Sequence, residues 1–414
     1  MEATKKVVIV GGGFGGLHLV RRLARGLRPG EAEVTLVDRR NYSLFTPLLY
    51  QVATGELPSH AVAAPLRHAT APAAFRFLQS EVEAIDAERR LVVTADGPLP
   101  YDHVVIAPGS VTTTYGIPGA DRYALPIKEL ADALAVRHAV LSSFERAAAE
   151  TDAARKKALL AFIIVGAGPV GVELASSLRD LFERTLRPMF PQLDLDRDTS
   201  IVLIDGSERV LGNMDQRLAW LAQRTLDRQR VRVVPRTYVA EVLPGSVRTR
   251  DGARFDAKTI IWAGGVTTNP LVVACDLVKA SDKRLLVDHS FRVGGRDDVL
   301  ALGDAAHFLQ DSKPLPQLAQ VAVLQAPAVA RNLVHLLRGE SPVPYRHREK
   351  GDLIALGRTS AGAKLGNVVF GGLLAWTVWR GYYLLRLSGA RGKATLLSEW
   401  ILSYFFSRTA ADTP

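Results

Sequence analysis

Glycine spacing near the start of the chain suits the binding of a phosphate. Five glycines fall within six residues, directly after the β-branched run Val7–Val10. Gly11, Gly13 and Gly16 form the pattern G-x-G-x-x-G: the first glycine permits a tight turn, the second lets the backbone approach a pyrophosphate, and the third lets a helix pack on a strand. The helix that we expect at 17–27 would direct the positive end of its dipole at the phosphate charge. The pattern therefore predicts a strand, a turn and a helix around a bound nucleotide.

An acidic residue at the end of the next strand completes such a site, because its carboxylate accepts hydrogen bonds from ribose hydroxyls. The segment VTLVD supplies Asp38, which lies 22 residues after Gly16. A glycine-rich loop of an ordinary doubly wound fold is the structural alternative, but the combination of strand, helix and acid favours a nucleotide site. We assign the neighbouring Phe14, Gly15 and Arg39 to the same site.

The same unit recurs in the middle of the chain. The segment AFIIVGAGPVGVELASSL repeats the strand, the glycine pattern and the helix, with Gly166, Gly168 and Gly171 in the three positions. The segment IVLID then ends in Asp205, 34 residues after the last glycine, so a longer helix and a loop must intervene. Chance duplication of the whole arrangement is improbable. Two nucleotide sites are therefore predicted, one for a bound dinucleotide and one for an exchanging dinucleotide.

A third stretch, VLALGDAAHF, predicts a short buried strand that ends in Gly303 and Asp304, with a helix beginning near Pro316. Here the chain resembles the flavoproteins with two dinucleotide-binding domains, in which such an aspartate binds the ribityl and pyrophosphate end of FAD. A loop residue that caps a helix is the alternative role of Asp304. The resemblance implies FAD at residues 11–16 and a nicotinamide nucleotide at residues 166–171.

That family also has short A-T-G-like strand ends where the chain crosses between domains. This sequence has IAPGS, with Ala107 and Gly109, and WAGGVTTNP, with Gly264, and neither has the threonine. We assign these three residues and Val82 to the cofactor sites.

Composition excludes several classes of protein. The single cysteine of the 414 residues, Cys275, rules out a disulfide framework, a thiolate metal cage within one chain and the disulfide reductases of this fold, which need a cysteine pair beside the flavin. The formal charge of +10 predicts an anionic partner, such as nucleic acid, acidic lipid or phosphorylated cofactors. The sequence shows no helix-turn-helix or base-stacking pattern, so we do not expect nucleic acid. We also expect no signal peptide, no spanning helix and no metal.

Nearly the whole length of the chain is similar to the type II NADH dehydrogenases, the single-chain NADH:quinone oxidoreductases. The similarity rests on NYSLFTPLLYQVATGEL, YDHVVIAPGSVTTTYGIPGADRYALPIKEL, GAGPVGVELA, PLPQLAQVAVLQAPAVARN and YRHREKGDLIALGRTSA. It implies that Glu173 in GVELA lies beside the nicotinamide. An exposed charge on the first turn of the helix is the alternative role of Glu173, since an acid is favoured near a positive helix end.

Members of that family place the motif A-Q-x-x-x-Q where flavin meets quinone. Ala319 and Gln320 match it, but Leu324 stands where the second glutamine is expected, and Gln325 follows one residue later. We assign Gln320 and Gln325 to the catalytic region together with Glu173, and Gln320 to cofactor binding as well. Pro327 in the same helical pattern is expected to kink the helix or free a carbonyl group. Glutamines on a half-buried, solvated helix are the structural alternative.

The segment after residue 341 differs in composition from the rest of the chain, with aromatic and basic residues interleaved. A second helix places the apolar residues Leu396, Leu397, Trp400, Ile401, Tyr404 and Phe405 on one broad face. A membrane-spanning helix at 368–387 would bury Arg380 in lipid, so a helix pair lying in the membrane interface costs less. The tryptophans at 376, 379 and 400 and the basic residues favour an anionic lipid surface. A helix pair that closes a homodimer is the alternative, and we expect this segment to be separable from the nucleotide-binding core.

The predicted fold is α/β, with two Rossmann-like dinucleotide-binding domains and a C-terminal amphipathic helical segment. We expect an FAD domain at 1–120 and 270–340, an NAD(H) domain at 121–269 and a membrane-associating segment at 341–414. The predicted function is oxidation of NADH and transfer of two electrons to a membrane quinone, at the cytoplasmic face of the cell membrane and without proton pumping. A soluble flavoprotein reductase that feeds a small electron-transfer protein is the alternative.

Overall fold

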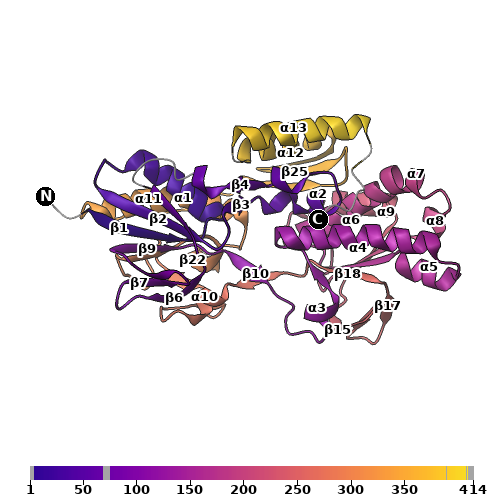
Figure 1. The fold of residues 1–414 in the computed structure, drawn as a ribbon, viewed down its shortest axis with the longest axis horizontal. Helices are drawn as coiled ribbons and strands as arrows, with labels where there is room; N and C mark the ends of the chain where they lie inside the picture. The colour runs from indigo at the N-terminus through magenta and orange to yellow at the C-terminus, as the bar shows by residue number, and fades with distance from the viewer. Residues whose placement is uncertain (1–3, 69–74, 388, 407, 409–414) are drawn as a thin grey trace. The chain divides into compact units, whose positions relative to one another are not determined.

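The computed structural model describes residues 4–68, 75–387, 389–406 and 408 (Figure 1). The chain divides into two compact units. Unit 1 consists of Met1–Leu44, Ala63–Val111 and Val266–Glu349, and unit 2 of Phe45–Val62, Thr112–Gly265 and Lys350–Pro414. Each unit is built on a parallel sheet that carries one of the two glycine patterns.

The main sheet of unit 1 has five parallel strands in the order β21-β9-β1-β2-β5. Their bounds are β1 (Lys5–Val10), β2 (Ala32–Asp38), β5 (Phe75–Gln79), β9 (His103–Ile106) and β21 (Val299–Ala301). Val7–Val10 are buried, which agrees with the apolar run expected of a central parallel strand. The helices α1 (Phe14–Gly26) and α11 (Ala319–Leu337) pack against each other beside this sheet (Figure 1).

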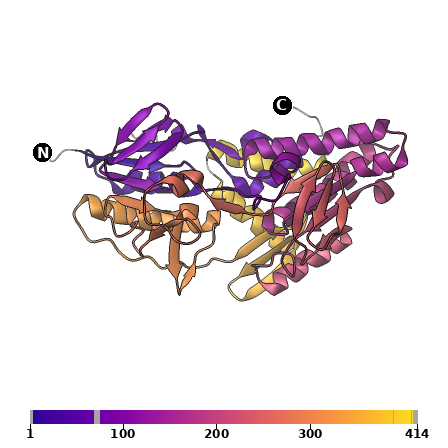
Figure 2. The same ribbon diagram turned by 90° about the horizontal axis from the view of Figure 1, so that it is seen from below.

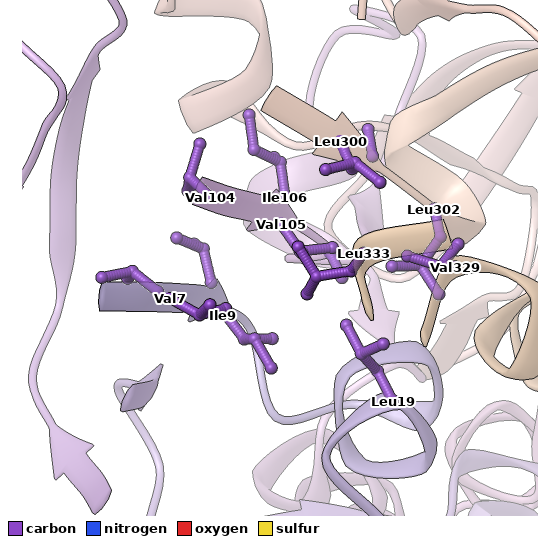
Figure 3. Packing of buried hydrophobic residues seen from close by; sticks show 14 of the residues in the cluster. Val7, Ile9, Leu19, Val104, Val105, Ile106, Leu300, Leu302, Val329 and Leu333 are labelled. Carbon is purple, nitrogen blue, oxygen red and sulfur yellow. The ribbon is translucent and has the colours of Figure 1, made fainter. Parts of the chain in front are cut away.

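The core of unit 1 lies between the sheet and these two helices. Figure 3 shows Leu19 of α1 and Leu333 of α11 gathered with Ile9 of β1 and Val105 of β9. All four side chains are fully buried. This packing fixes the carboxyl ends of the strands, where the glycine loop and the Gly303 turn lie.

Smaller elements complete unit 1. Two three-stranded sheets have the orders β6-β7-β8 and β20-β22-β23, and the strands of the first are purple in Figure 2. The bounds are β3 (Tyr42–Leu44), β4 (Ala63–Pro65), η3 (Leu66–His68), β6 (Val82–Asp86), β7 (Leu91–Thr94), β8 (Gly97–Pro100), α10 (Pro270–Ala274), β20 (Leu285–Val287), η5 (Gly303–Ala305), β22 (Ala306–Gln310) and β23 (Lys313–Pro314). The chain passes between the units at five points, two of which lie at β10 (Ser110–Thr112) and β19 (Val266–Thr268).

Unit 2 has a second five-stranded parallel sheet, in the order β11-β18-β12-β13-β14. Its strands are β11 (Leu125–Pro126), β12 (Ala161–Val165), β13 (Ser200–Ile204), β14 (Val231–Val234) and β18 (Thr259–Trp262). The associated helices are α3 (Ala120–Tyr123), α4 (Leu130–Ala149), α5 (Ala153–Leu159), α6 (Pro169–Leu181), η4 (Phe182–Leu186), α7 (Arg187–Met189), α8 (Leu195–Asp198) and α9 (Gln216–Arg228). An antiparallel sheet of β15 (Val239–Leu243), β16 (Ser246–Thr249) and β17 (Arg254–Asp256) lies beside them.

The C-terminal residues belong to unit 2. They form an antiparallel sheet of β24 (Asp352–Ala355), β25 (Ala361–Leu365) and β26 (Val368–Gly372), followed by α12 (Leu373–Arg386) and α13 (Ala390–Phe405). The short elements η1 (Thr46–Leu48), α2 (Leu49–Ala53) and η2 (Ser59–Ala61) also lie in this unit, and η2 packs against α13. The sheet β24-β25-β26 contacts α6 and α9, so this segment is an integral part of unit 2. Its separability from the nucleotide-binding core therefore stays a prediction, which has to contend with these contacts.

Some expected element bounds need correction. The first helix begins at Phe14 instead of 17, because the last two glycines of the loop lie inside its first turn. The helix expected from Pro316 begins at Ala319. The first helix of the C-terminal pair begins at Leu373, because Val368–Gly372 pair with β25. Among the described residues, none of the helices combines the length and hydropathy needed to cross a membrane.

Candidate functional site

The glycines of the first loop divide into two physical roles. Gly11 adopts a φ of +100°, and a Cβ at this position would collide with the carbonyl group of Ala107. A Cβ at Gly16 would collide with the carbonyl oxygen of Gly11. The position of a Cβ on Gly13, in contrast, has nothing within 4 Å. Gly13 is the N-cap residue of α1 and no side chain caps this helix, so the open face at Gly13 fits a pyrophosphate at the positive helix end.

Asp38 braces this loop. Its carboxylate accepts hydrogen bonds from the Gly12 amide at 2.7 Å and from the Arg40 amide at 2.8 Å. A carboxylate has about four lone-pair sites, so ribose hydroxyls can still be accepted. Arg39 itself is exposed, and its carbonyl oxygen accepts a hydrogen bond from Gln79. The predicted ribose acid thus has a second role, which is to fix the backbone of the glycine loop.

The turn at Gly303 and Asp304 is held by polar side chains of unit 1. Ser110 donates its hydroxyl hydrogen bond to Asp304 Oδ2 at 2.5 Å, and Gln317 donates to the backbone oxygen of Asp304 at 3.1 Å. The side-chain oxygen of Gln325 accepts from the Gly303 amide at 2.7 Å. Asp304 is half-buried and Gly303 has a φ of +67°. The cap role is not seen, because Asp304 lies in the three-residue turn η5, which no side chain caps.

The two predicted catalytic glutamines do not share a face of α11. They are five residues apart, which is about 140° of rotation on an α-helix. Gln325 is 1% exposed and bonded to the Gly303 turn, whereas Gln320 is half-buried. Pro327 lies inside the helix, which continues to Leu337. The geometry gives Gln325 a positioning role at Gly303, and Gln320 faces a different direction.

The remaining residues assigned to the first site lie around the same loop or on neighbouring strands. Ala107 is buried at the carboxyl end of β9, and Gly109 adopts a φ of +74° two residues later. Phe14 is half-buried and Gly15 is buried in the first turn of α1. Val82 begins β6 and is half-buried. Among them, Ala107 lies against the glycine loop, since a Cβ on Gly11 would meet its carbonyl group and a Cβ on Gly15 would lie near its side chain.

The second loop repeats the geometry of the first. Gly166 has a φ of +105°, and a Cβ there would collide with the carbonyl group of Ala263. A Cβ at Gly171 would collide with the Gly166 carbonyl oxygen, while the position on Gly168 is open. A Cβ built on Gly264 would lie within 3.1 Å of the Trp262 indole. The two loops therefore offer the same open face to a phosphate.

Asp205 occupies the position that Asp38 has in unit 1. Its carboxylate accepts from the Ala167 amide at 2.5 Å and from the Ser207 amide at 2.6 Å. Arg209 points back into its own loop, where its guanidinium donates to the carbonyl oxygens of Gly212 and Met214. The site therefore has an acceptor for ribose hydroxyls in Asp205, whereas the Arg209 guanidinium bonds to its own loop.

Glu173 is buried inside unit 2. Its side chain is 6% exposed, and Oε1 accepts a hydrogen bond from the Ala355 amide of β24 at 2.9 Å. Burial raises the pKa of Glu173 from 4.5 to about 8, and the Ala355 bond opposes this only in part. Burial and the nearby Glu173 charge also raise the pKa values of Tyr50 and Tyr383. The alternative of an exposed helix charge is excluded, and the carboxyl group is mainly protonated at neutral pH.

Sequence reasoning missed a buried polar cluster next to Glu173, which we call the Glu56 cluster and define as Glu56, Arg380, Arg408, Ser177 and Thr54. Glu56 accepts from Arg408 at 3.1 Å and pairs with Arg380 at 3.8 Å. Arg408 also donates to the backbone oxygen and hydroxyl of Ser177 at 3.1 Å, and Ser177 is 2.8 Å from Thr54 Oγ1. One signal in the sequence could have revealed this cluster. Glu56 stands in an apolar context, and a charge in a buried segment requires a partner.

The tryptophans of the C-terminal helices are mostly buried. Trp379 is 1% and Trp400 2% exposed, and the Trp400 indole donates to Gln51 at 3.1 Å. Arg380 lies over the rings of Trp376 and Trp400 at 4.0 and 4.7 Å. The expectation that these groups face a membrane is wrong for Trp379, Trp400 and Arg380, because stacking and the Glu56 ion pair hold them inside the unit.

The outer side of α12 and α13 is apolar. The predicted face of α13 is divided, since Leu396 and Trp400 pack inward while its other described members are exposed; the side chain of Tyr404 lies outside the described residues. We call this side the outer apolar surface. Its large exposed apolar side chains are Leu373, Leu374, Leu385, Leu397, Ile401, Leu402, Phe405 and Phe406. Arg391 is exposed at its border, and Lys393 is half-buried there.

The model of the pyridine nucleotide-disulphide oxidoreductase family matches residues 5–326. The type II NADH:quinone oxidoreductase Ndh of Mycobacterium tuberculosis is 31% identical, and the alignment covers 97% of this chain and 89% of that protein. The probable NADH dehydrogenase of Dictyostelium discoideum is 30% identical, with 98% and 90% covered.

Solved structures share the fold. The NDH2 of Plasmodium falciparum in complex with NADH has a TM-score of 0.90 at 21% identity, with 99% of this chain and 100% of that chain covered. The sulfide:quinone oxidoreductase of Aquifex aeolicus has a TM-score of 0.75 at 20% identity, with 98% and 96% covered. With two matching glycine loops, two bracing aspartates and these relatives, the chain belongs to the pyridine nucleotide-disulphide oxidoreductase family and, within it, to the type II NADH:quinone oxidoreductases.

Proposed function

We propose that the protein oxidises NADH and reduces a membrane quinone, with FAD as its bound cofactor. The observation that carries this proposal is the duplicated glycine loop, braced in both units by an aspartate that ends the second strand. The names of the relatives, which describe NADH:quinone oxidoreductases, support the same activity. Unit 1 would hold FAD and unit 2 would hold NADH.

The residues of unit 1 fit an FAD molecule. The open face at Gly13 would accept the pyrophosphate, Asp38 would accept the ribose hydroxyls, and the turn at Asp304 would hold the ribityl and phosphate end. Ser110 and Gln325 hold that turn in place. Bound FAD supplies the two-electron chemistry that connects NADH oxidation to quinone reduction.

The residues of unit 2 fit NADH. The open face at Gly168 accepts the pyrophosphate, and Asp205 accepts the ribose hydroxyls and repels a 2′-phosphate. We assign Glu173 to the nicotinamide side of this site, as the family resemblance implies. In its protonated form the Glu173 carboxyl keeps negative charge out of a buried position and retains one hydrogen-bond donor.

The outer apolar surface is proposed to bind the membrane. Its exposed leucines and phenylalanines lie on two adjacent helices of unit 2, and Arg391 and Lys393 border it. Each buried apolar side chain contributes at most about 1.5–3 kcal/mol and each basic residue near an anionic leaflet about 1 kcal/mol. Several such groups suffice to hold the protein on a lipid surface and so bring it to a lipid-soluble quinone.

The membrane role is tested by substituting two residues of this surface. Leu374→Ser and Phe405→Ser together remove two of its most exposed side chains, which are 67% and 77% exposed. We expect the binding of the double variant to anionic vesicles to fall by about tenfold or more, measured by cosedimentation. Leu309→Ser, on an exposed leucine of unit 1, is the matched control and should bind as the wild type does. Equal sedimentation of all three proteins would contradict a membrane role for α12 and α13.

The raised pKa of Glu173 predicts a pH dependence of stability. Between about 4.5 and about 8 the folded protein keeps a proton on Glu173 that the unfolded chain releases, so this group stabilises the fold less as the pH rises through that window. Glu173→Gln removes the titration, and we expect its thermal unfolding midpoint to fall less over this pH range than that of the wild type. Glu399→Gln on α13 serves as the control variant. An identical pH dependence in wild type and Glu173→Gln would contradict the buried, protonated state.

The proposed activity is tested by steady-state NADH oxidation with and without a short-chain quinone. The soluble-reductase alternative predicts instead that a small acidic electron-transfer protein is reduced and that the quinone is not. We expect turnover to require the quinone, with one NADH consumed for each quinone reduced. Reduction of the electron-transfer protein in place of the quinone would favour the alternative.

A further inference from the structure

Two loops of unit 2 lie side by side at the edge of its sheet where Asp205 is found. The strands β13 and β14 are parallel neighbours, so the loops that follow them leave the sheet at the same edge. The Thr237 amide donates to the backbone oxygen of Asp205 at 2.9 Å, and the Arg236 amide donates to the backbone oxygen of Ser207 at 2.8 Å. These backbone bonds fix residue 236 next to the acid that is proposed to accept the ribose hydroxyls.

An exposed ion pair spans the two loops. The Arg236 guanidinium donates to Glu208 Oε1 at 3.1 Å, and the two side chains are 72% and 79% exposed. Two other arginines near these loops are held elsewhere. Arg209 donates to backbone oxygens of its own loop, and Arg250 lies over the Tyr238 ring at 5.2 Å. Arg236 is therefore the arginine of these two loops whose known partner is an exposed carboxylate that a ligand can replace.

We propose that Glu208 is a specificity-determining residue for the nucleotide, acting as a positioning residue through Arg236. This inference rests on the proposed function, which places the adenosine ribose of NADH at Asp205. A 2′-phosphate on that ribose, as in NADPH, presents three acceptor oxygens and close to two negative charges, which match the planar fork of an arginine. In the wild type, Glu208 occupies the guanidinium of Arg236 and adds negative charge beside Asp205.

The proposal makes NADPH use depend on a competition. An exposed ion pair is weak, so a phosphate that reaches Arg236 can displace Glu208, but it then leaves an unpaired carboxylate nearby. Removing the Glu208 charge frees Arg236 and lowers the repulsion at the same time. Asp205 keeps its hydrogen bonds to the glycine loop in either case, so the ribose position itself is retained.

The test compares Glu208→Gln, Arg236→Gln and the double variant with the wild type. Each protein is assayed for kcat/KM with NADH and with NADPH, using a short-chain quinone, and for competitive inhibition by adenosine 2′,5′-bisphosphate and by ADP. The matched control is Asp256→Asn, which breaks the exposed ion pair of Asp256 with Arg254 elsewhere in unit 2. Flavin content and unfolding midpoint are measured for all variants.

We expect Glu208→Gln to raise the NADPH to NADH ratio of kcat/KM by about tenfold, the change given by one hydrogen bond to a charged group. Inhibition by the 2′,5′-bisphosphate should strengthen in parallel, weaken with added salt, and return to the wild-type level in the double variant. Asp256→Asn should leave the ratio where it is in the wild type. An unchanged ratio in Glu208→Gln, or an equal rise in the double variant, would overturn the inference. A failure of the proposed function would be seen in a different measurement, since the wild type itself would then not reduce quinone with NADH.

Discussion

Replacing Gly16 by Ala is expected to weaken FAD binding strongly, because the new Cβ would collide with the carbonyl oxygen of Gly11. The collision is with the backbone of the turn directly after β1, so the turn must shift and the loop loses the shape that receives a pyrophosphate. Overpacking of a tight site costs about 1–3 kcal/mol, and a backbone clash belongs at the upper end of that range. We expect the flavin content per chain to fall by about tenfold or more, together with a lower unfolding midpoint of unit 1.

Gly13→Ala separates cofactor binding from folding in the same loop. The Cβ position on Gly13 has nothing within 4 Å, so the apoprotein should unfold at the wild-type temperature while its FAD binding is weakened at the open face. Gly381→Ala on α12, where the space is also open, is the control; it should keep its FAD binding and lose no stability, since alanine is favoured over glycine inside a helix. A Gly16→Ala protein that carries one flavin per chain would show that the loop tolerates the clash and that our account of it is wrong.

Replacing Arg408 by Gln is expected to destabilise unit 2 strongly. The Glu56 and Arg408 side chains are 5% and 7% exposed, and removing one partner leaves Glu56 buried with only the longer contact to Arg380. Breaking a buried pair costs about 3–5 kcal/mol. The bonds from residue 408 to Ser177 of α6 are lost as well, so we expect faster proteolysis after α13 and a lower unfolding midpoint in the same variant.

The matched control is Arg254→Gln, which breaks an exposed pair with Asp256 and should change the free energy of unfolding by no more than about 1 kcal/mol. Adding Glu56→Gln to Arg408→Gln removes the second buried charge and should recover part of the loss. If Arg408→Gln unfolds at the same temperature as Arg254→Gln, the Glu56 cluster does not hold the C-terminal helices in place.

The parts of the fold that were predictable from the sequence are local. The glycine patterns and the acids Asp38 and Asp205 lie within one strand-turn-helix-strand unit each, and their spacing is imposed by the turn and by the strand that follows. The bracing bonds from these acids to the amides of Gly12 and Ala167 were not predicted, although both loops repeat them. They depend on how closely neighbouring strand ends approach, which spacing alone does not report.

The parts that escaped prediction depend on residues far apart in the chain. Glu173 is buried because β24 covers it, and the Ala355 amide that bonds to it is 182 residues away. The arginine-rich, tryptophan-rich texture of the C-terminal helices indicates a membrane surface by composition, yet Arg380 and Trp400 are turned inward by Glu56 and Gln51. A composition pattern does not distinguish an aromatic side chain at an interface from one that stacks on a buried cation, because both use the same residue types.

The most direct test of the central claim, that this chain passes electrons from NADH through a bound flavin to a quinone, is an anaerobic titration of the purified protein. We expect the yellow flavin absorbance to disappear with one equivalent of NADH per flavin and to return with one equivalent of a short-chain quinone. A flavin that NADH does not bleach, or that stays bleached when the quinone is added, would contradict the account.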